Sequence, residues 1–167
     1  MKHAILYYSR SGNTRELAEQ IYVTLPEEDK VIDDIQKSSA IPTADMYWIG
    51  FPVSNMNCPA EVMTLLEELE NTRIALFATS GLAPVPNYKS LVEKRTMNWL
   101  SSSCEYLGMF MCQGKTENSQ KELIAADFSN NSDNIMEMLN AGDTHPNDED
   151  YDNLSEFCDK IAGVLNG

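Results

Sequence analysis

The sequence predicts one α/β domain built on a doubly wound, five-stranded parallel sheet with helices on both faces. Short apolar runs alternate strictly with segments of helical period along the chain. Each run is continuous, as in strands that are buried on both faces of a sheet. A length of 167 residues allows one domain with a substantial core, so residues 1–167 are expected to fold as a single unit.

The first 35 residues predict a strand, a helix and a second strand. Residues 4–8 form a continuous apolar run. From residue 14 to residue 25 apolar side chains recur at helical spacing, and Pro26 ends that pattern. A short second strand is expected over residues 31–35.

The middle of the chain repeats the alternation. A third strand is expected over residues 46–51, and after a loop Pro59 suits the first position of a helix because the missing N–H is not needed there. A fourth strand, residues 74–78, leads into a loop over residues 79–88. A helix is expected to follow over about residues 89–100.

The last third of the chain is less regular. A fifth strand is expected over residues 104–112, and a helical stretch over residues 119–139 is interrupted near residues 130–131. An acidic loop at residues 142–150 precedes a final helix. Its apolar residues are expected on one face, at Leu154, Phe157, Ile161 and Val164.

Charge and hydropathy argue against several classes of protein. The formal net charge is −14 at pH 7, whereas binding to nucleic acids or anionic membranes depends on Lys and Arg. No apolar run is long enough to cross a bilayer, and the first residues lack the apolar core of a signal peptide, so we expect a cytoplasmic protein. The acidity either serves solubility alone or also steers the chain toward a basic patch on a partner protein.

The cysteines and histidines do not predict a metal site. The four cysteines, at positions 58, 104, 112 and 158, include no close pair, and the two histidines lie far apart. Zinc sites usually need closely spaced pairs of ligands. We therefore expect reduced thiols and no bound metal.

The most informative segment is Ser9-Arg10-Ser11-Gly12-Asn13-Thr14, between the first expected strand and the first helix. Such a turn aims backbone N–H groups at one point in front of the positive end of a helix, and Ser9, Ser11 and Thr14 add hydroxyl donors. Gly12 lets the backbone approach a ligand closely. The segment lacks the Lys of a nucleoside-triphosphate loop and the G-x-G-x-x-G of a dinucleotide site, so a single terminal phosphate fits best. The alternative is a turn that only caps the helix.

This hexapeptide resembles the phosphate loop of the flavodoxins, [ST]-x-[ST]-G-N-T. Length, strand–helix alternation and acidity agree with that family over the whole chain. The resemblance implies a flavodoxin-like fold with strand order 2-1-3-4-5. It also implies one FMN, held non-covalently at the switch point between the first and third strands. We further expect a monomer.

In flavodoxins the loops after the third and fourth strands hold the flavin ring. The resemblance implies a first ring loop of Pro52, Val53, Ser54, Asn55, Met56, Asn57 and Cys58, and a second that contains Thr79, Ser80, Gly81 and Tyr88. Flavodoxins commonly stack an aromatic residue on each face of the ring, but residues 52–58 include none. The Pro-Val edge or a methionine would cover that face instead. Tyr88 either stacks on the ring or begins a helix and packs on the core.

Three smaller features carry hypotheses of their own. In flavodoxins a flexible peptide group forms a hydrogen bond with flavin N5. Residues 55–57 would supply such a peptide without a glycine, because Asn tolerates left-handed backbone. Cys58 and Cys112 fall near the carboxyl ends of strands but have no evident basic neighbour, so we interpret them as small buried hydrophobes. Residues 113–115 (Gln-Gly-Lys) either border the flavin or only end the fifth strand.

These observations lead to three hypotheses of function. The first is a non-catalytic electron carrier that shuttles electrons through FMN between redox partners with basic docking surfaces. Its potential would be low, because an acidic protein disfavours the negative charge that a flavin gains on reduction. The second is an FMN-dependent reductase that uses NAD(P)H to reduce a quinone-like or pigment substrate. The third is a flavin-free interaction module. The chain also resembles short flavodoxin-like proteins of anaerobic bacteria, including the BilS type associated with bilirubin reduction. The segments that carry this resemblance are T-S-G, F-M-C-Q-G-K and H-P-N-D-E-D.

Overall fold

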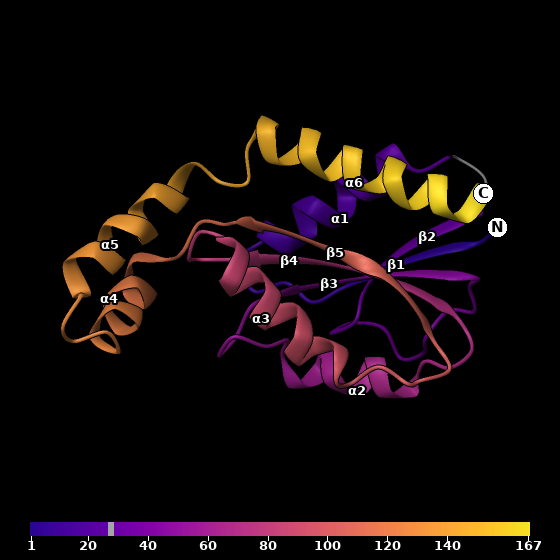
Figure 1. Cartoon of the computed structure of the whole chain (residues 1–167), viewed down its shortest axis with the longest axis horizontal. Coiled ribbons are helices and arrows are strands. Elements are labelled where there is room, and N and C mark those ends of the chain that lie inside the picture. The colour runs from indigo at the N-terminus through magenta and orange to yellow at the C-terminus, as the bar shows by residue number, and fades with distance from the viewer. Residues whose placement is uncertain (27–28) are drawn as a thin grey trace.

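The strands form one parallel sheet. The computed structural model describes residues 1–26 and 29–167. Its five strands are β1 (His3–Tyr7), β2 (Lys30–Asp34), β3 (Met46–Pro52), β4 (Arg73–Ser80) and β5 (Glu105–Gln113). All neighbours pair in parallel, in the order β2-β1-β3-β4-β5 (Figure 1). The predicted fold class and strand order are confirmed.

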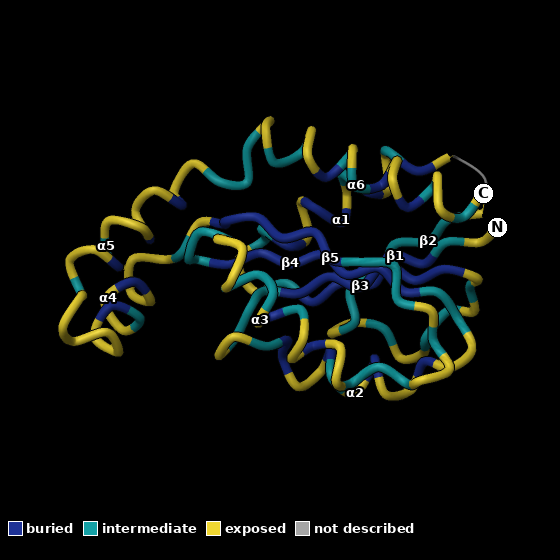
Figure 2. Tube along the Cα trace, viewed as in Figure 1, coloured by how far each residue is buried: buried dark blue, intermediate teal, exposed yellow. Residues whose placement is uncertain are grey.

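Burial on both faces explains why the central strands are continuously apolar. In register, Ile5 of β1 lies beside Trp48 of β3, and Leu6 lies beside Ile49. Successive side chains of a strand point to opposite faces, so the first pair enters one core and the second pair enters the other. All four residues are at most 2% exposed. Figure 2 shows the central strands as the most deeply buried part of the chain.

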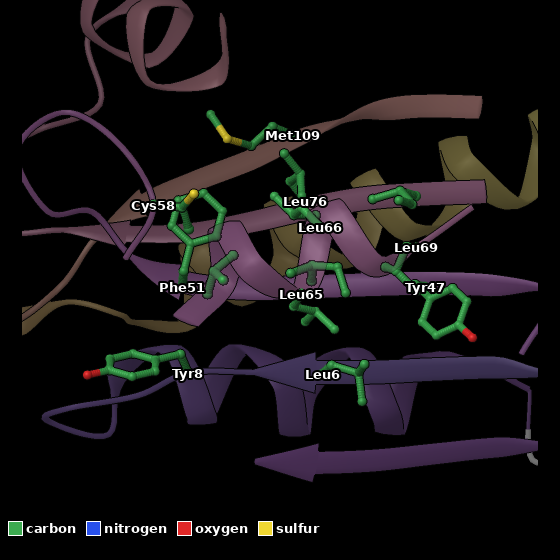
Figure 3. Close-up of a cluster of buried hydrophobic side chains, with 14 of the residues drawn as sticks. Leu6, Tyr8, Tyr47, Phe51, Cys58, Leu65, Leu66, Leu69, Leu76 and Met109 are labelled. Atoms are coloured by element: carbon green, nitrogen blue, oxygen red, sulfur yellow. The ribbon is translucent and has the colours of Figure 1, made fainter. Parts of the chain in front are cut away.

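Helices cover both faces of the sheet. α1 (Asn13–Thr24) and α6 (Asp148–Asn166) pack on the Ile5 face, whereas α2 (Ala60–Glu68) and α3 (Pro86–Met97) pack on the Leu6 face (Figure 1). Figure 3 shows the second of these cores, where leucines of α2 meet side chains of β1, β3 and β4. Both cores leave the carboxyl edge of the sheet to the connecting loops.

A pair of helices extends beyond that carboxyl edge. α4 (Asn118–Ala126) and α5 (Ser132–Ala141) follow β5 and lie past the strand ends in Figure 1, and we refer to residues 118–141 as the α4–α5 hairpin. A short 3-10 turn, Gly142–Thr144, then leads toward α6. Among the residues that the structure describes, no helix is both long and apolar enough to span a membrane.

A buried cation helps to hold the α4–α5 hairpin together. Lys121 of α4 is only 3% exposed, and its Nζ lies 2.7 Å from Asp143 Oδ1 and 3.0 Å from Asn140 Oδ1. A buried charge is costly unless it is paired and hydrogen-bonded, and Lys121 has both kinds of partner. The hairpin also has a small apolar core of Ala125, Ile135 and Leu139, with Leu82 packed against it.

The structure changes three details of the expected elements. α3 begins at Pro86 rather than at residue 89, because the fixed φ of proline suits the first position of a helix. The helical stretch after β5 is two helices that separate near the expected interruption. Val164 is 62% exposed, because the buried stripe of α6 runs through residues 154, 158 and 161 to the partly buried Leu165, and Val164 lies one position off it.

Candidate functional site

A cavity of about 370 Å³ opens at the carboxyl edge of the sheet, and we call it the edge cavity. Its wall comes from the turns after β1, β3, β4 and β5 and from α4. The lining residues are Arg10, Ser11, Asn13, Pro52, Val53, Thr79, Ser80, Gly81, Gly114, Lys115, Thr116, Glu117, Gln120 and Ile124. This is the edge at which open α/β sheets bind ligands, and the volume falls in the range of small-molecule sites, about 300–1,000 Å³.

The turn after β1 presents donors to the cavity. Gly12 precedes α1 with a φ of 101°, a left-handed conformation that glycine adopts without strain. Ser9 Oγ accepts the Gly12 N–H at 3.1 Å and lies 3.4 Å from the Arg15 nitrogen, which closes the turn. Among the described residues, nothing accepts the backbone N–H groups of Ser11, Asn13 or Thr14. The turn therefore offers unpaired N–H groups at the positive end of a helix.

Two threonines join the first helix to the fourth strand. Thr14 is 1% exposed, and its hydroxyl lies 2.9 Å from the hydroxyl of Thr79. The Thr79 carbonyl in turn accepts the Val53 N–H at 2.8 Å. These contacts bring the ends of α1, β3 and β4 together. One of the two hydroxyls donates to the other, and the accepting hydroxyl keeps its own hydrogen for a further partner.

The end of β5 completes the wall. Gln113 is 7% exposed, and its Nε2 donates to the carbonyl oxygens of Gly81 at 2.8 Å and Met138 at 2.7 Å. Gly114 and Lys115 line the edge cavity directly. The Gln-Gly-Lys segment thus both ends the strand and borders the site.

The first ring loop contributes only its beginning to the cavity wall. Pro52 and Val53 line the cavity, and residues 54–57 form a tight turn in which Ser54 and Asn57 exchange backbone hydrogen bonds of 2.9 and 3.0 Å. Asn55 and Met56 have φ values of 51° and 58°. The left-handed backbone therefore occurs in the segment where asparagine, which tolerates that conformation, predicted it. Movement of this peptide stays a prediction.

A cation holds that turn from outside. Arg95 of α3 donates from Nη1 to the Asn55 carbonyl oxygen at 3.3 Å. A non-glycine pair in left-handed backbone costs free energy unless neighbouring contacts support it. Arg95 is a residue that sequence reasoning missed, because 40 positions separate it from Asn55.

Tyr88 lies in the first turn of α3 and outside the wall of the edge cavity. Its ring packs against the core on the α2–α3 face, and its hydroxyl lies 3.0 Å from Ser80 Oγ. Burial raises the pKa of this phenol above its ordinary value. These contacts match the structural interpretation of Tyr88, in which it begins a helix and packs on the core.

The two cysteines near the strand ends are buried. Cys58 is 1% exposed and belongs, with Phe51, to the core on the α2–α3 face, and Figure 3 labels both residues. Burial raises the pKa of the Cys58 thiol to about 11 and raises that of Cys112 further. Neither thiol ionises readily near neutral pH, which fits small buried hydrophobes.

Part of the wall comes from residues that the sequence did not single out. Thr116 and Glu117, just before α4, and Gln120 and Ile124 of α4 line the cavity. The helical period of this stretch predicted a helix, but nothing within it indicated that the helix lines a cavity at the strand ends. The interactions that place it there, through Gln113 and Lys121, connect positions far apart in sequence.

The donor set suits a phosphomonoester. The turn at residues 9–14 offers unpaired N–H groups and hydroxyls, and a Cβ placed at Gly12 would meet no atom within 4 Å, so the space in front of the glycine is open. Anions bind at such helix ends through these N–H groups and the helix dipole. None of the lining residues is aromatic, and Pro52, Val53 and Ile124 form the apolar part of the wall.

Known proteins are similar to this chain in sequence. A family model described as flavodoxin domain matches residues 4–159. A flavodoxin-like domain-containing protein BilS from Clostridioides difficile (strain CD3) is 29% identical over 169 residues, which cover 95% of this chain and 94% of that protein. The predicted resemblance to the flavodoxins and to their BilS type is confirmed.

Solved structures show the same architecture. A flavodoxin from the domain Archaea matches with a TM-score of 0.59 and 13% identity over the whole of both chains. A flavoprotein in complex with FMN from Lactobacillus acidophilus NCFM matches with a TM-score of 0.52 and 21% identity, covering 66% of this chain and 93% of that one. These structures share the fold, and the family match spans most of the sequence. The chain therefore belongs to the flavodoxin domain family.

Proposed function

We propose that this protein binds one FMN non-covalently in the edge cavity and carries electrons through it between partner redox proteins. One observation carries the proposal: the phosphate loop and the turns after β3 and β4 line a single cavity. An FMN placed there would set its phosphate at residues 9–14 and its ring beside Pro52, Val53 and Gly81. The flavoprotein of Lactobacillus acidophilus, which was solved with FMN, has the same fold.

The protein's own part is binding and electrostatics, whereas a bound flavin supplies the redox chemistry. Ser11, Asn13 and Thr14 offer N–H groups to the phosphate. The apolar residues Pro52, Val53 and Ile124 would contact the ring in place of aromatic side chains. Aliphatic contacts lack the favourable quadrupole geometry of stacked rings, so we expect the phosphate to contribute a large share of the affinity.

Net charge supports a donor of low potential. A reduced flavin carries more negative charge than the oxidised one, and a chain with a formal charge of −14 disfavours that gain. Screening beyond about 8–10 Å weakens the contribution of distant charges. Because the lining side chains themselves sum to +1, any lowering of the potential would come from acids just outside the cavity wall. The same acidity would guide the protein to a partner with a basic surface. Four free cysteines, three of them buried, suit the reducing cytoplasm in which we place this function.

The test begins with FMN added to the apoprotein. Binding of one equivalent should quench flavin fluorescence and change the visible spectrum. A protein that stays colourless after incubation with FMN would contradict the proposal and favour an interaction module.

A second measurement separates electron carriage from direct reduction by a nicotinamide. NAD(P)H is added anaerobically to the FMN-loaded protein, and bleaching is followed with and without a separate flavin reductase. We expect slow bleaching alone and fast bleaching with the reductase. Fast bleaching by NAD(P)H alone would instead indicate an FMN-dependent reductase.

A further inference from the structure

We infer that Lys115 makes this site select a phosphorylated flavin over riboflavin. The inference rests on the proposed binding of FMN and adds a specificity-determining residue from outside the phosphate loop. Lys115 stands 102 positions beyond Asn13 in sequence, yet both residues line the edge cavity. The loop supplies dipoles to a phosphate, and Lys115 would supply a full positive charge.

The main chain of Lys115 is fixed beside the start of α1. Asn13 Nδ2 donates to the Lys115 carbonyl oxygen at 2.9 Å, and the Lys115 N–H donates to the His145 carbonyl oxygen at 2.9 Å. The preceding residue must be small, because a Cβ at Gly114 would lie 2.6 Å from Asn13 Nδ2. The side chain of Lys115 therefore originates next to the N–H groups of the phosphate loop.

The ammonium group of Lys115 has no carboxylate partner. Within the described part of the chain, Lys115 forms neither a salt bridge nor a side-chain hydrogen bond, although acidic residues outnumber basic ones by 26 to 12. Arg10 is the other cation of the wall, and its guanidinium lies 5.6 Å from the centroid of the Tyr8 ring. Arg10 Nε also lies 3.5 Å from the Tyr8 hydroxyl. Of the two cations of the wall, Lys115 is therefore the one whose head group has no contact with another side chain among the described residues.

Local charge differs in sign from the charge of the whole chain. The charged residues of the wall are two cations, Arg10 and Lys115, and one acid, Glu117. The lining side chains therefore carry a formal charge of +1 (two minus one), whereas the whole chain carries −14. A phosphomonoester carries about −1.5 to −2 at pH 7 and needs compensation when it leaves water. Riboflavin has the same ring and no phosphate, so Lys115 would stabilise FMN and not riboflavin.

The experiment measures dissociation constants of FMN and riboflavin by fluorescence quenching. It compares the wild type, Lys115→Gln, Lys115→Arg and Lys94→Gln. Lys94 is an exposed residue of α3 outside the cavity, so its variant removes the same charge elsewhere. Lys115→Gln should weaken FMN binding about five- to tenfold, as expected for one charge-assisted contact that solvent partly screens. Riboflavin binding should stay unchanged, Lys115→Arg should restore most of the FMN affinity, and Lys94→Gln should resemble the wild type.

A pH series adds a readout that a purely structural role would not change. The second ionisation of a phosphomonoester has a pKa of about 6, so FMN binding by the wild type should weaken between pH 7.5 and 5.5. The weakening should be smaller in Lys115→Gln. Equal losses for FMN and riboflavin, or an unchanged ratio of the two dissociation constants, would overturn the inference while FMN binding stands. A wild type that binds neither flavin would contradict the proposed function itself.

Discussion

The side-chain amide of Gln113 donates to the carbonyl oxygen of Gly81 at 2.8 Å and so joins the end of β5 to the turn after β4. The same nitrogen donates to the Met138 carbonyl oxygen of α5 at 2.7 Å. One buried amide thus connects two parts of the edge cavity with the α4–α5 hairpin. Space around it is tight, since a Cβ at Gly142 would lie 2.9 Å from Gln113 Nε2.

Replacing Gln113 by Leu should loosen the hairpin from the sheet. Both carbonyl groups would lose their donor, and we expect a cost of about 1–3 kcal/mol in the free energy of unfolding. Amide hydrogen exchange should speed up about ten- to hundredfold in α5 and less in the central strands. Gln36→Leu, at an exposed position, should leave exchange in α5 unchanged. Equal protection of α5 in wild type and Gln113→Leu would show that this amide does not hold the hairpin.

The buried threonine pair predicts a non-additive double mutant. Thr79→Val leaves the Thr14 hydroxyl, at 1% exposure, without its partner and should destabilise the protein by about 1–3 kcal/mol in urea unfolding. The double variant Thr14→Val/Thr79→Val leaves neither hydroxyl unpaired. Its cost should therefore be smaller than the sum of the two single costs. A strictly additive cycle would argue against the contact.

Two glycines should respond to alanine in opposite directions. Gly12 has a φ of 101°, so Gly12→Ala should cost about 1–2 kcal/mol through backbone strain, although the space in front of it is open. Gly163 lies inside α6, and a methyl group at this position would meet no atom within 4 Å, so Gly163→Ala should gain about 0.5–1 kcal/mol. Thermal unfolding of the two variants tests both signs, and a stabilised Gly12→Ala would refute the left-handed turn.

His3 predicts that stability falls on mild acidification. Trp48 Nε1 donates to His3 Nδ1 at 3.2 Å, which requires a neutral imidazole. Burial first, and then the nearby N-terminal charge, lower the pKa of His3, while Asp45 opposes them. The unfolded chain, with a histidine pKa of about 6.5, therefore takes up the proton first. The contribution of His3 is complete above that pH and is lost as the pH falls below it.

Urea unfolding followed by Trp fluorescence between pH 7.5 and 5.5 measures this effect. We expect the wild type to lose stability over this range and His3→Gln to lose less. Identical pH dependence in the two proteins would mean that the imidazole titrates alike in the folded and unfolded chains.

Local patterns predict the sheet, which the structure confirms, and single out the turn at residues 9–14. Buried strands such as β1 and β3 are recognisable from their continuous apolar runs, and the turn at residues 9–14 combines hydroxyls and a glycine within six positions. The α4–α5 hairpin shows what such patterns lack. Its place beside the cavity depends on Gln113 and on the pair of buried Lys121 with Asp143, contacts that no local spacing encodes.

The loop that follows β4, residues 79–88, likewise contains residues whose positions the sequence predicts and one whose position it does not. Thr79, Ser80 and Gly81 line the cavity because they lie at the end of a strand at the carboxyl edge, and their contact with a flavin stays a prediction. For Tyr88 the sequence allows either stacking on the ring or a place in the first turn of a helix, and Pro86 begins α3 early enough that Tyr88 packs on the core. The position at which α3 begins thus decides where Tyr88 lies. Helix boundaries are weakly encoded in a single sequence.

Amide NMR during a flavin titration shows whether the turn at residues 9–14 binds the terminal phosphate of FMN. Addition of FMN to the isotope-labelled apoprotein should move the backbone amide resonances of Ser11, Asn13 and Thr14 strongly, because these N–H groups gain an anionic acceptor. Riboflavin should leave them nearly unmoved. Flavin binding that leaves these three resonances in place with FMN would contradict the account.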